Sequence, residues 1–336
     1  MSKVNIGLVL GLLLGLMAGC HNRIELYPAP VKLNGKFGFA TISPGKNPEM
    51  VISPQFDWAD RFYEGLALVK MGDKFGFIDK TGKIVIEPQF VQTGVFSEGL
   101  ARVQVDGKVG YIDREFSKTK QLAISARFEE GGDFSEGLAN VKLGKRWGYI
   151  DRSGRLIIPA KFDRALGFSQ GRGAVKFEDR VGYLDREGKI VVETLFDAGW
   201  YFSENLTRVK IVGKWGYIDR SGNILIDAEY DGAGAFKEGL ARVRVKDKWG
   251  FIDRKGKLVI NPGYDLAGEF SEGLARVMNQ GRFGYIDKKG RMVISLQFDY
   301  AEDFQQGVAQ VWQGKKMGYI GKNFGKTKKF LWQPSE

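Results

Sequence analysis

Few side chains of this chain could carry out catalysis. His21 is the single histidine and Cys20 the single cysteine among 336 residues, which excludes histidine-based catalytic triads and zinc sites built from several histidines. A stretch that looks like a phosphate-binding loop, Gly321-Lys322-Asn323-Phe324-Gly325-Lys326-Thr327, has one residue too few between its glycines. The 40 acidic residues leave a carboxylate-dependent hydrolase as the enzymatic alternative. We therefore expect no enzyme, no cofactor and no metal site.

Cys20 is the clearest candidate for chemical modification. It follows a short cationic start, an apolar run over residues 6–18 and the small residues Ala18 and Gly19. The run is shorter than the roughly 20 apolar residues that span a bilayer. The segment resembles a bacterial lipoprotein signal, which implies lipidation of Cys20, with palmitate among the acyl chains. A secretory signal with an incidental buried cysteine is the alternative.

The lipoprotein interpretation divides the chain into three parts. We expect a signal peptide over residues 1–19, a lipidated start and tether over 20–30, and one domain over 31–336. In lipoproteins of this kind, His21 in place of an aspartate would favour release to the outer membrane. The interpretation therefore predicts a lipid-anchored protein of the bacterial cell envelope.

The net charge of +11 favours anionic partners. These include acidic glycans, lipid headgroups and acidic proteins, whereas the export signal argues against nucleic acid. The oligomeric state is left open by these features.

Nine copies of one short motif organise the rest of the chain. A glycine with an aromatic residue after it recurs at intervals of 38, 34 and 38 residues and then five times at 34, from Gly38 to Gly318. Two residues before each glycine there is always Lys or Arg, at Lys36, Lys74, Lys108, Arg146, Arg180, Lys214, Lys248, Arg282 and Lys316. Such a fixed period is typical of a repeat architecture.

Each repeat has the pattern of β-structure. Segments such as Lys214-Trp215-Gly216-Tyr217-Ile218-Asp219 alternate with period two, and Asp219-Arg220-Ser221-Gly222 has the residues of a type I turn. We expect an all-β fold of nine three-stranded antiparallel units of about 34 residues, joined by connectors, with no convincing helix. The two four-residue insertions fall in the same hairpin turn, near Lys46 and Lys118, and the last unit lengthens there too, near Lys326.

Whether the units close is decided by the ends of the array. An open solenoid needs polar capping units, and neither end of this array has one. Ile24 occupies the connector position that is Phe in other units, and the last strand ends almost at the terminus. We therefore favour a closed propeller-like ring, with an open β-solenoid as the alternative.

The full register of the motif identifies a family. Lys214-Trp215-Gly216, Lys248-Trp249-Gly250 and Arg146-Trp147-Gly148, with the upstream Phe-Ser-Glu-Gly-Leu-Ala, resemble the bacterial WG (KWG) repeat family over about residues 24–332. The resemblance implies an all-β repeat protein of interaction-type function with no catalytic residues to transfer.

Three repeated positions have a structural and a functional interpretation. The aromatic rings could stack on sugars or bases, but we expect them to pack between units. The Asp-Arg/Lys turns could hold calcium, but we expect turn formers with a solvated basic neighbour. The nine Lys and Arg residues before the glycines could contact an anionic ligand or partner, or form a plain solvated edge.

These patterns favour a non-enzymatic envelope lipoprotein that presents a β surface to a protein or glycan. The first alternative is a protein that binds an anionic envelope polymer through the Lys/Arg ladder and the basic run Lys326, Lys328 and Lys329. The second alternative is the carboxylate-dependent hydrolase.

Overall fold

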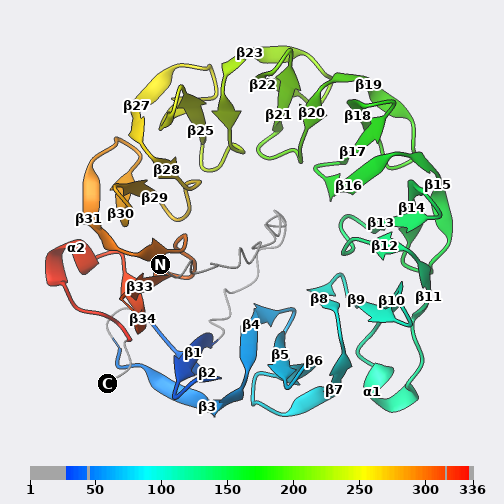
Figure 1. Ribbon diagram of the computed structural model, residues 1–336, viewed down its shortest axis with the longest axis horizontal. Coiled ribbons are helices and arrows are strands. Elements are labelled where there is room, and N and C mark those ends of the chain that lie inside the picture. The colour runs from blue at the N-terminus through cyan, green and yellow to red at the C-terminus, as the bar shows by residue number, and fades with distance from the viewer. Residues whose placement is uncertain (1–27, 44–45, 315, 333–336) are drawn as a thin grey trace, which may run out of the picture.

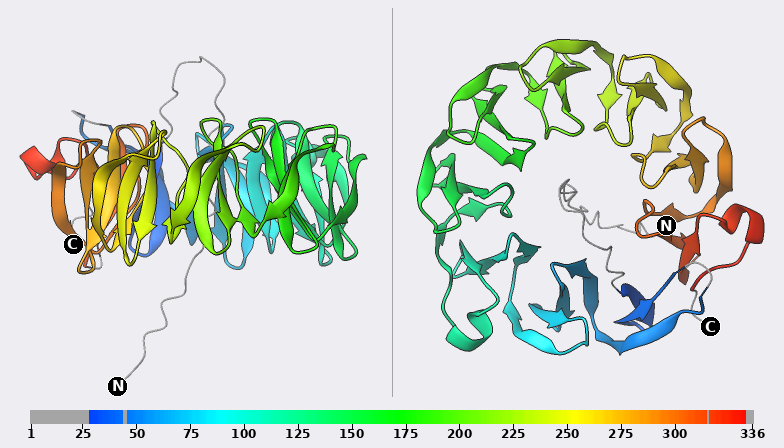
Figure 2. Two further views of the ribbon diagram at one scale, coloured as in Figure 1. Left: turned by 90° about the horizontal axis from the view of Figure 1, so that it is seen from above. Right: turned by 180° about the vertical axis from the view of Figure 1, so that it is seen from behind.

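Nine small antiparallel sheets stand around a ring in the computed structural model, which describes residues 28–43, 46–314 and 316–332 (Figure 1). Consecutive sheets follow one another along the chain, so each is one blade of a β-propeller. The strands run between two flat faces that carry the turns (Figure 2). The predicted signal and Cys20 lie outside the described residues.

Each blade begins with its innermost strand and continues outward to the rim of the ring. Blades 1 to 3 contain β1 (Ala29–Leu33), β2 (Lys36–Thr41) and β3 (Glu49–Phe56); β4 (Trp58–Tyr63), β5 (Leu66–Met71), β6 (Lys74–Asp79) and β7 (Ile84–Phe90); and β8 (Thr93–Ser97), β9 (Leu100–Val105), β10 (Lys108–Ile112) and β11 (Ile124–Phe128). Blades 4 to 6 contain β12 (Glu130–Gly131), β13 (Leu138–Leu143), β14 (Arg146–Asp151) and β15 (Leu156–Phe162); β16 (Arg164–Ser169), β17 (Arg172–Phe177), β18 (Arg180–Leu184) and β19 (Ile190–Phe196); and β20 (Ala198–Gly199), β21 (Leu206–Ile211), β22 (Lys214–Asp219) and β23 (Ile224–Tyr230). Blades 7 to 9 contain β24 (Gly232–Ala233), β25 (Leu240–Val245), β26 (Lys248–Asp253) and β27 (Leu258–Tyr264); β28 (Leu266–Ala267), β29 (Leu274–Asn279), β30 (Arg282–Asp287) and β31 (Met292–Phe298); and β32 (Tyr300–Ala301), β33 (Val308–Gln313) and β34 (Lys316–Gly321).

The blades differ from the predicted three-stranded units because the connector supplies an inner strand. Seven sheets have four strands, and the described parts of the first and last have three. Several inner strands are only two residues long, such as β20 and β24. Their brevity leaves little alternating pattern, so the sequence alone predicts connectors at these positions.

The repeated glycine allows the outer strand of its own blade to approach. A Cβ on Gly216 would lie 2.5 Å from the carbonyl oxygen of Ile226 and 2.8 Å from the nitrogen of Ala228. The pairing register of β22 with β23 shifts at this position, as expected for a β-bulge. A side chain is therefore excluded by the neighbouring backbone.

The aromatic residue after each glycine packs between blades, as predicted. The Tyr217 ring is fully buried, and its centroid lies 4.8 Å from that of Phe236 in the next blade in an edge-to-face arrangement. Its hydroxyl donates a hydrogen bond to the Gly234 carbonyl at 2.8 Å. Equivalent ring pairs with centroids 4.9 or 5.0 Å apart join other blades: Phe39–Phe62, Phe77–Phe96, Tyr111–Phe134, Tyr149–Phe168, Tyr183–Phe202, Phe251–Phe270 and Tyr285–Phe304.

The ring closes between blades 9 and 1, so the solenoid alternative is wrong. The Tyr319 hydroxyl donates to the Pro30 carbonyl at 2.8 Å. Val31 and Ile42 share a buried cluster with Val308 and Tyr319. Backbone near Trp332 pairs with Tyr319, so the end of the chain completes the last blade. The first strand begins at Ala29, two residues before the expected domain boundary.

Two short helices occupy two of the three lengthened turns, those near Lys118 and Lys326, where no helix was expected. They are α1 (Phe116–Thr119) and α2 (Phe324–Thr327), which project at the outside of the ring (Figure 1). Phe116 packs on Phe90 of the preceding blade, and Phe324 packs on Phe298. Each of these inserted turns thus covers the outer strand of the preceding blade. The composition of the turns predicts only exposed loops.

Candidate binding groove between the second and third blades

A three-part contact, which we call the carboxylate clamp, joins neighbouring blades. In the clamp between blades 6 and 7, Lys214 Nζ lies 2.5 Å from Asp231 Oδ1, and the Lys246 backbone N–H donates to Asp231 Oδ2 at 2.7 Å. Lys214 begins β22, Asp231 follows β23, and Lys246 is in the turn after β25. One carboxylate therefore links a cation of one blade to a turn amide of the next.

Seven of the eight junctions between consecutive described blades, from blade 1 to blade 9, contain this clamp. Its members, as cation, carboxylate and turn amide, are Lys36, Asp57 and Gly72; Lys108, Glu129 and Gly144; Arg146, Asp163 and Glu178; Arg180, Asp197 and Gly213; Lys214, Asp231 and Lys246; Lys248, Asp265 and Gln280; Arg282, Asp299 and Gly314. The nine predicted Lys and Arg contacts thus begin β2 in blade 1 and the third strand in each of the other eight blades. The seven in these clamps are ion-paired.

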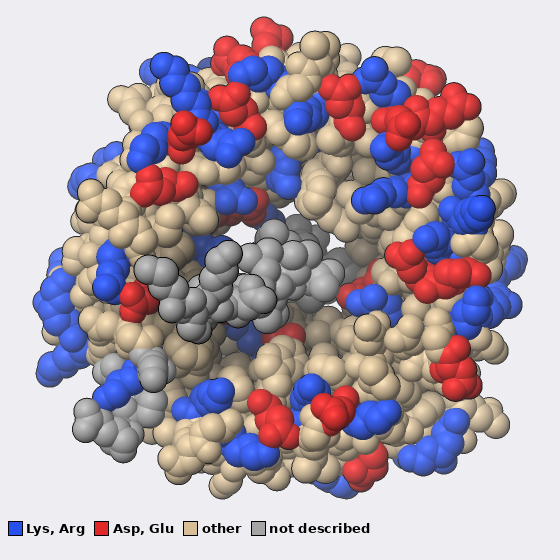
Figure 3. Space-filling model, viewed as in Figure 1, with Lys and Arg blue, Asp and Glu red and all other residues tan. Residues whose placement is uncertain are grey.

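The clamp favours the charged form of its carboxylate. A hydrogen bond from the Lys214 side chain, followed by the backbone N–H of Lys246, holds the pKa of Asp231 below its usual value. Lys36 and Lys248 have the same effect on the pKa of Asp57 and Asp265. Figure 3 shows positive and negative side chains side by side around the visible face of the ring, not a stripe of one sign.

The junction between blades 2 and 3 lacks the clamp. Phe75 pairs with Phe90 in the register of β6 and β7, which places Lys74 opposite Val91. Val91 therefore stands where other junctions have an acidic residue, and its side chain is 58% exposed. Within the described part of the chain, Lys74 forms no ion pair. The corresponding turn residue, Asp106, is also exposed.

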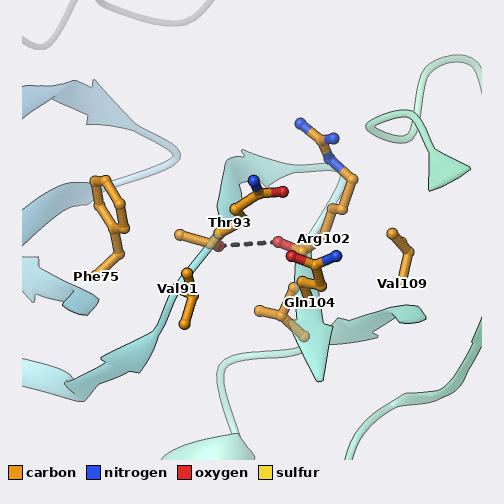
Figure 4. A pocket seen from close by; sticks show the side chains of 8 residues that line it. Phe75, Val91, Thr93, Arg102, Gln104 and Val109 are labelled. Atoms are coloured by element: carbon orange, nitrogen blue, oxygen red, sulfur yellow. Dashed lines mark hydrogen bonds between the residues drawn. The ribbon is translucent and has the colours of Figure 1, made fainter. Parts of the chain in front are cut away.

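A groove of about 240 Å³ lies at this junction. It is lined by Phe75, Val91, Gln92, Thr93, Arg102, Val103, Gln104 and Val109. Figure 4 shows Phe75 at one end and Val109 at the other, with Val91, Thr93 and Gln104 between them. Val109 holds the position before the glycine that is Trp in blades such as blade 6, so the smaller side chain leaves room.

The polar wall of the groove is held together within blade 3 and is anchored to blade 4. The Thr93 hydroxyl donates to the Arg102 carbonyl at 2.9 Å (Figure 4). The Arg102 side chain reaches the next blade, where Nε lies 3.2 Å from Asp133 Oδ1 and Nη1 donates to the Gly131 carbonyl at 3.1 Å. Arg102 is thus fixed by its partners, whereas Gln92 is exposed at the groove.

A second polar cluster, which the sequence does not predict, lies at the inner strands of blades 6 to 9. Arg208 lies over the Trp200 ring at 4.9 Å from its centroid, and Arg242 lies at the same distance from Trp249. Arg276 Nε lies 3.2 Å from Asp303 Oδ1, close enough for an ion pair although the atoms are not aligned for a hydrogen bond. One feature of the sequence could have indicated this cluster: the residue before the repeated valine is Arg in only some units.

Burial at these inner strands shifts the pKa of both acidic and basic side chains. It raises the pKa of Asp303 and lowers that of Arg242, since each charged group loses water. The neighbouring charges offset part of this cost. The cluster is therefore an internal network that joins blades.

The Asp-Arg/Lys turns are turn formers, as predicted, but their basic residues are engaged. The Gly154 N–H donates to the Asp151 carbonyl at 2.9 Å, and the hydrogen bond from the Ser153 hydroxyl lowers the pKa of Asp151. Lys288 Nζ lies 3.0 Å from Glu238 of the preceding blade. The basic neighbour therefore contacts another blade, where plain solvation was expected. Across the described ranges, no group of three or more His, Cys, Asp or Glu residues could hold a metal ion.

The Phe-Ser-Glu-Gly turns explain the remaining repeated residues. The Ser97 hydroxyl donates to the Phe134 carbonyl of the next blade at 2.7 Å. Glu64 accepts from the backbone N–H groups of Glu98 and Gly99 at 2.6 and 2.9 Å. Both side chains therefore connect one blade to the next on the face opposite the carboxylate clamps.

Comparisons with solved structures agree on the propeller fold. A chain described as a eukaryotic initiation factor is 12% identical, with a TM-score of 0.61 over 89% of this chain and 94% of that one. The dihydro-heme d1 dehydrogenase NirN in complex with DHE is 13% identical, with a TM-score of 0.50 over 81% of this chain and 72% of that one. No curated protein matches the chain. No helix in the described ranges is long and apolar enough to cross a membrane.

The repeat itself gives the family. The model of the WG containing repeat matches eight times, over residues 45–75, 75–108, 110–147, 147–180, 182–215, 215–249, 249–282 and 283–316. These matches cover most of the ring and coincide with its period. The chain therefore belongs to the WG-repeat family, and its repeats form a nine-bladed β-propeller suited to a binding or scaffold role.

Proposed function

We propose that the chain is a lipid-anchored protein of the bacterial cell envelope that binds a partner protein and catalyses no reaction. The groove between blades 2 and 3 is the proposed docking site. The observation that carries the proposal is the exposed Val91 beside a groove, at the one junction between consecutive described blades without a carboxylate clamp. The lipoprotein-like start of the chain supports the location.

The groove fits part of a protein better than a free small molecule. Its volume of about 240 Å³ is below the roughly 300–1,000 Å³ of sites that enclose small ligands. Phe75, Val91 and Val109 offer apolar contact, and Gln92 and Gln104 offer amides that can bond a backbone. A protruding side chain with its flanking backbone matches both features.

An anionic polymer is less well supported as the partner. Seven of the predicted cationic contacts already have a carboxylate neighbour, as in the pair Lys214 and Asp231 at 2.5 Å. A bound polymer would have to displace these intramolecular pairs. The mixed charges in Figure 3 would also give it no continuous positive track.

A glycan is the second candidate partner, supported by two exposed aromatic residues. Trp200 and Tyr201 follow the inner strand of blade 6 and are 42% and 37% exposed. Exposed rings can stack on a flat ligand face. A glycan binding at these rings would be weakened by Trp200→Ala and unaffected by changes in the groove.

Site-specific photocrosslinking in living cells tests the protein partner. A crosslinking residue at Gln92 should give a discrete protein adduct, whereas one at Glu130, the equivalent exposed position at a clamped junction, should not. Equal adducts at both positions, or none at Gln92, would contradict the docking site.

The anchor is tested separately. Cys20→Ser should abolish acyl-chain labelling and leave the unprocessed precursor. Unchanged labelling in that variant would remove the lipoprotein part of the proposal.

A further inference from the structure

We infer that the junction between blades 2 and 3 binds a carboxylate side chain, Asp or Glu, of the partner protein. This carboxylate would take the place that the chain's own acidic residue has at the clamped junctions. The inference rests on the proposed function and specifies the chemistry of the partner.

Lys74 and Asp106 hold the sequence positions of the clamp's cation and turn amide at the junction that contains Val91. Lys74 begins β6, as Lys36 begins β2 and Lys214 begins β22. The register of β6 and β7 places Lys74 beside the end of the outer strand, where Lys36 meets Asp57 at 2.5 Å in its own blade. Lys74 forms no ion pair within the described ranges, so its ammonium group is available.

The turn amide is also in place. Asp106 is the first residue of the two-residue turn between β9 and β10, with φ 48°. The first turn residue donates to the clamp carboxylate at most other junctions, for example Lys246 to Asp231 at 2.7 Å. The Asp106 N–H donates to no side chain in the part of the chain that the structure describes.

The side chain of Asp106 does not prevent such binding. Glu178 occupies the same turn position at the junction of blades 4 and 5, and its N–H still donates to Asp163 at 2.9 Å. A negative side chain at the turn is thus compatible with a bound carboxylate.

An acidic side chain on a peptide fits this arrangement better than a free anion. The carboxylate would receive one bond from Lys74 and one from Asp106, and charge-assisted bonds of this kind are the stronger ones. The adjoining groove would receive the flanking residues against Phe75 and Val109. A small anion could bind Lys74 and the Asp106 N–H, but it would make no contact with the groove.

The experiment is an NMR titration that follows the Asp106 amide of the isotope-labelled protein. The probe is the blocked tripeptide acetyl-Val-Glu-Val-amide, and its neutral counterpart is acetyl-Val-Gln-Val-amide. We expect a saturable downfield shift of the Asp106 N–H with the Glu peptide and binding at least about tenfold weaker with the Gln peptide.

Two variants locate the site. Val91→Asp should fill the position with the chain's own carboxylate and abolish the shift caused by the Glu peptide. Lys36→Ala removes a cation from a clamped junction and should leave peptide binding unchanged.

Several results would overturn the inference. These are equal binding of the two peptides, undiminished binding to Val91→Asp, no saturable shift, or acetate that binds as tightly as the Glu peptide. A crosslinked partner at Gln92 that is captured equally by Val91→Asp would leave the proposed function intact and refute carboxylate recognition. No crosslinked partner, with specific Glu-peptide binding, would refute the docking function instead.

Discussion

Two junctions of the ring can be compared directly: the one between blades 6 and 7 and the one between blades 2 and 3. They share a buried aromatic pair but differ in the carboxylate clamp. Both contain a buried aromatic pair, Tyr217 with Phe236 and Phe77 with Phe96. Only the first has a carboxylate clamp; at the second, Val91 replaces the acidic residue. Both junctions also have a glutamate that accepts from a turn N–H of the next blade, Glu204 from Gly239 and Glu64 from Gly99. Adjacent blades therefore stay together without the clamp.

The largest loss of stability should come from removing a ring of the buried aromatic pair that both junctions contain. Phe77→Ala at the open junction and Phe251→Ala at a clamped one remove rings that are 1% and 0% exposed. Each should lower the free energy of unfolding by about 3–5 kcal/mol, since a buried aromatic leaves a cavity. Denaturant unfolding measures the loss, and hydrogen exchange shows whether the two adjacent blades lose protection together. A loss at Phe251 alone would mean that the open junction is not held by its rings.

The repeated glycine should have the next largest effect at both junctions. Alanine at Gly76 or Gly250 would place a Cβ 2.5 Å from a carbonyl oxygen of the outer strand. We expect a loss of about 1–3 kcal/mol in each variant, as for overpacking elsewhere. Gly263→Ala is the control, because its Cβ would meet nothing closer than 3.8 Å. A comparable loss in that control would mean that the cost is not steric.

Acid should weaken the clamped junctions selectively. The pKa of Asp231 and of Asp265 lies below the ordinary value of 3.8 in the folded protein. The clamps therefore contribute stability above about pH 4, which is lost as the pH falls through the lowered pKa values. Hydrogen exchange at pH 5 and pH 3 in low salt should show blades 6 to 8 losing protection while the contact between blades 2 and 3 changes less. Equal losses at both junctions would contradict this assignment.

The smallest effect should come from changing one clamp. Val91→Asp supplies the missing carboxylate and should raise the melting temperature slightly, whereas Asp231→Asn should lower it slightly, since exposed ion pairs contribute little. Val91→Asn is the control of equal size, and it should stabilise less than Val91→Asp because it cannot neutralise Lys74. A lower melting temperature for Val91→Asp would show that the groove does not accept the side chain.

Much of the fold could be predicted because the period is carried by residues with fixed physical roles. Gly216 must leave room for the backbone of the outer strand, and Tyr217 must fill a space between blades. Asp219 and Gly222 must form a turn. These requirements recur along the array, so the strand order and the exposed turns were predictable. Closure was favoured correctly from the absence of capping units. The inner strands were not recognised, because a segment such as Gly232–Ala233 has too few residues for an alternating pattern.

The candidate site was harder to predict because it depends on a departure from the repeat. The Lys and Arg residues before the glycines were recognised as a ladder, but their partners are 17 or 21 residues further on, across a hairpin. Without the strand register, Asp231 could not be assigned to Lys214, and Val91 could not be seen as the exception. Aligning the residue after the outer strand in all units would have found it. The contacts of Arg102 with Asp133 depend on the packing of separate blades and have no local signature.

Amide hydrogen exchange at the turn after each second strand tests the account most directly. The clamps bond the N–H groups of Gly72, Glu178, Lys246 and Gln280, and Asp106 has no such acceptor within the described structure. We predict that the Asp106 amide exchanges fastest of these five and that Val91→Asp slows it toward the others. Equal protection of Asp106 in the unmodified protein, or no change in Val91→Asp, would contradict the central claim that this junction has an open carboxylate position.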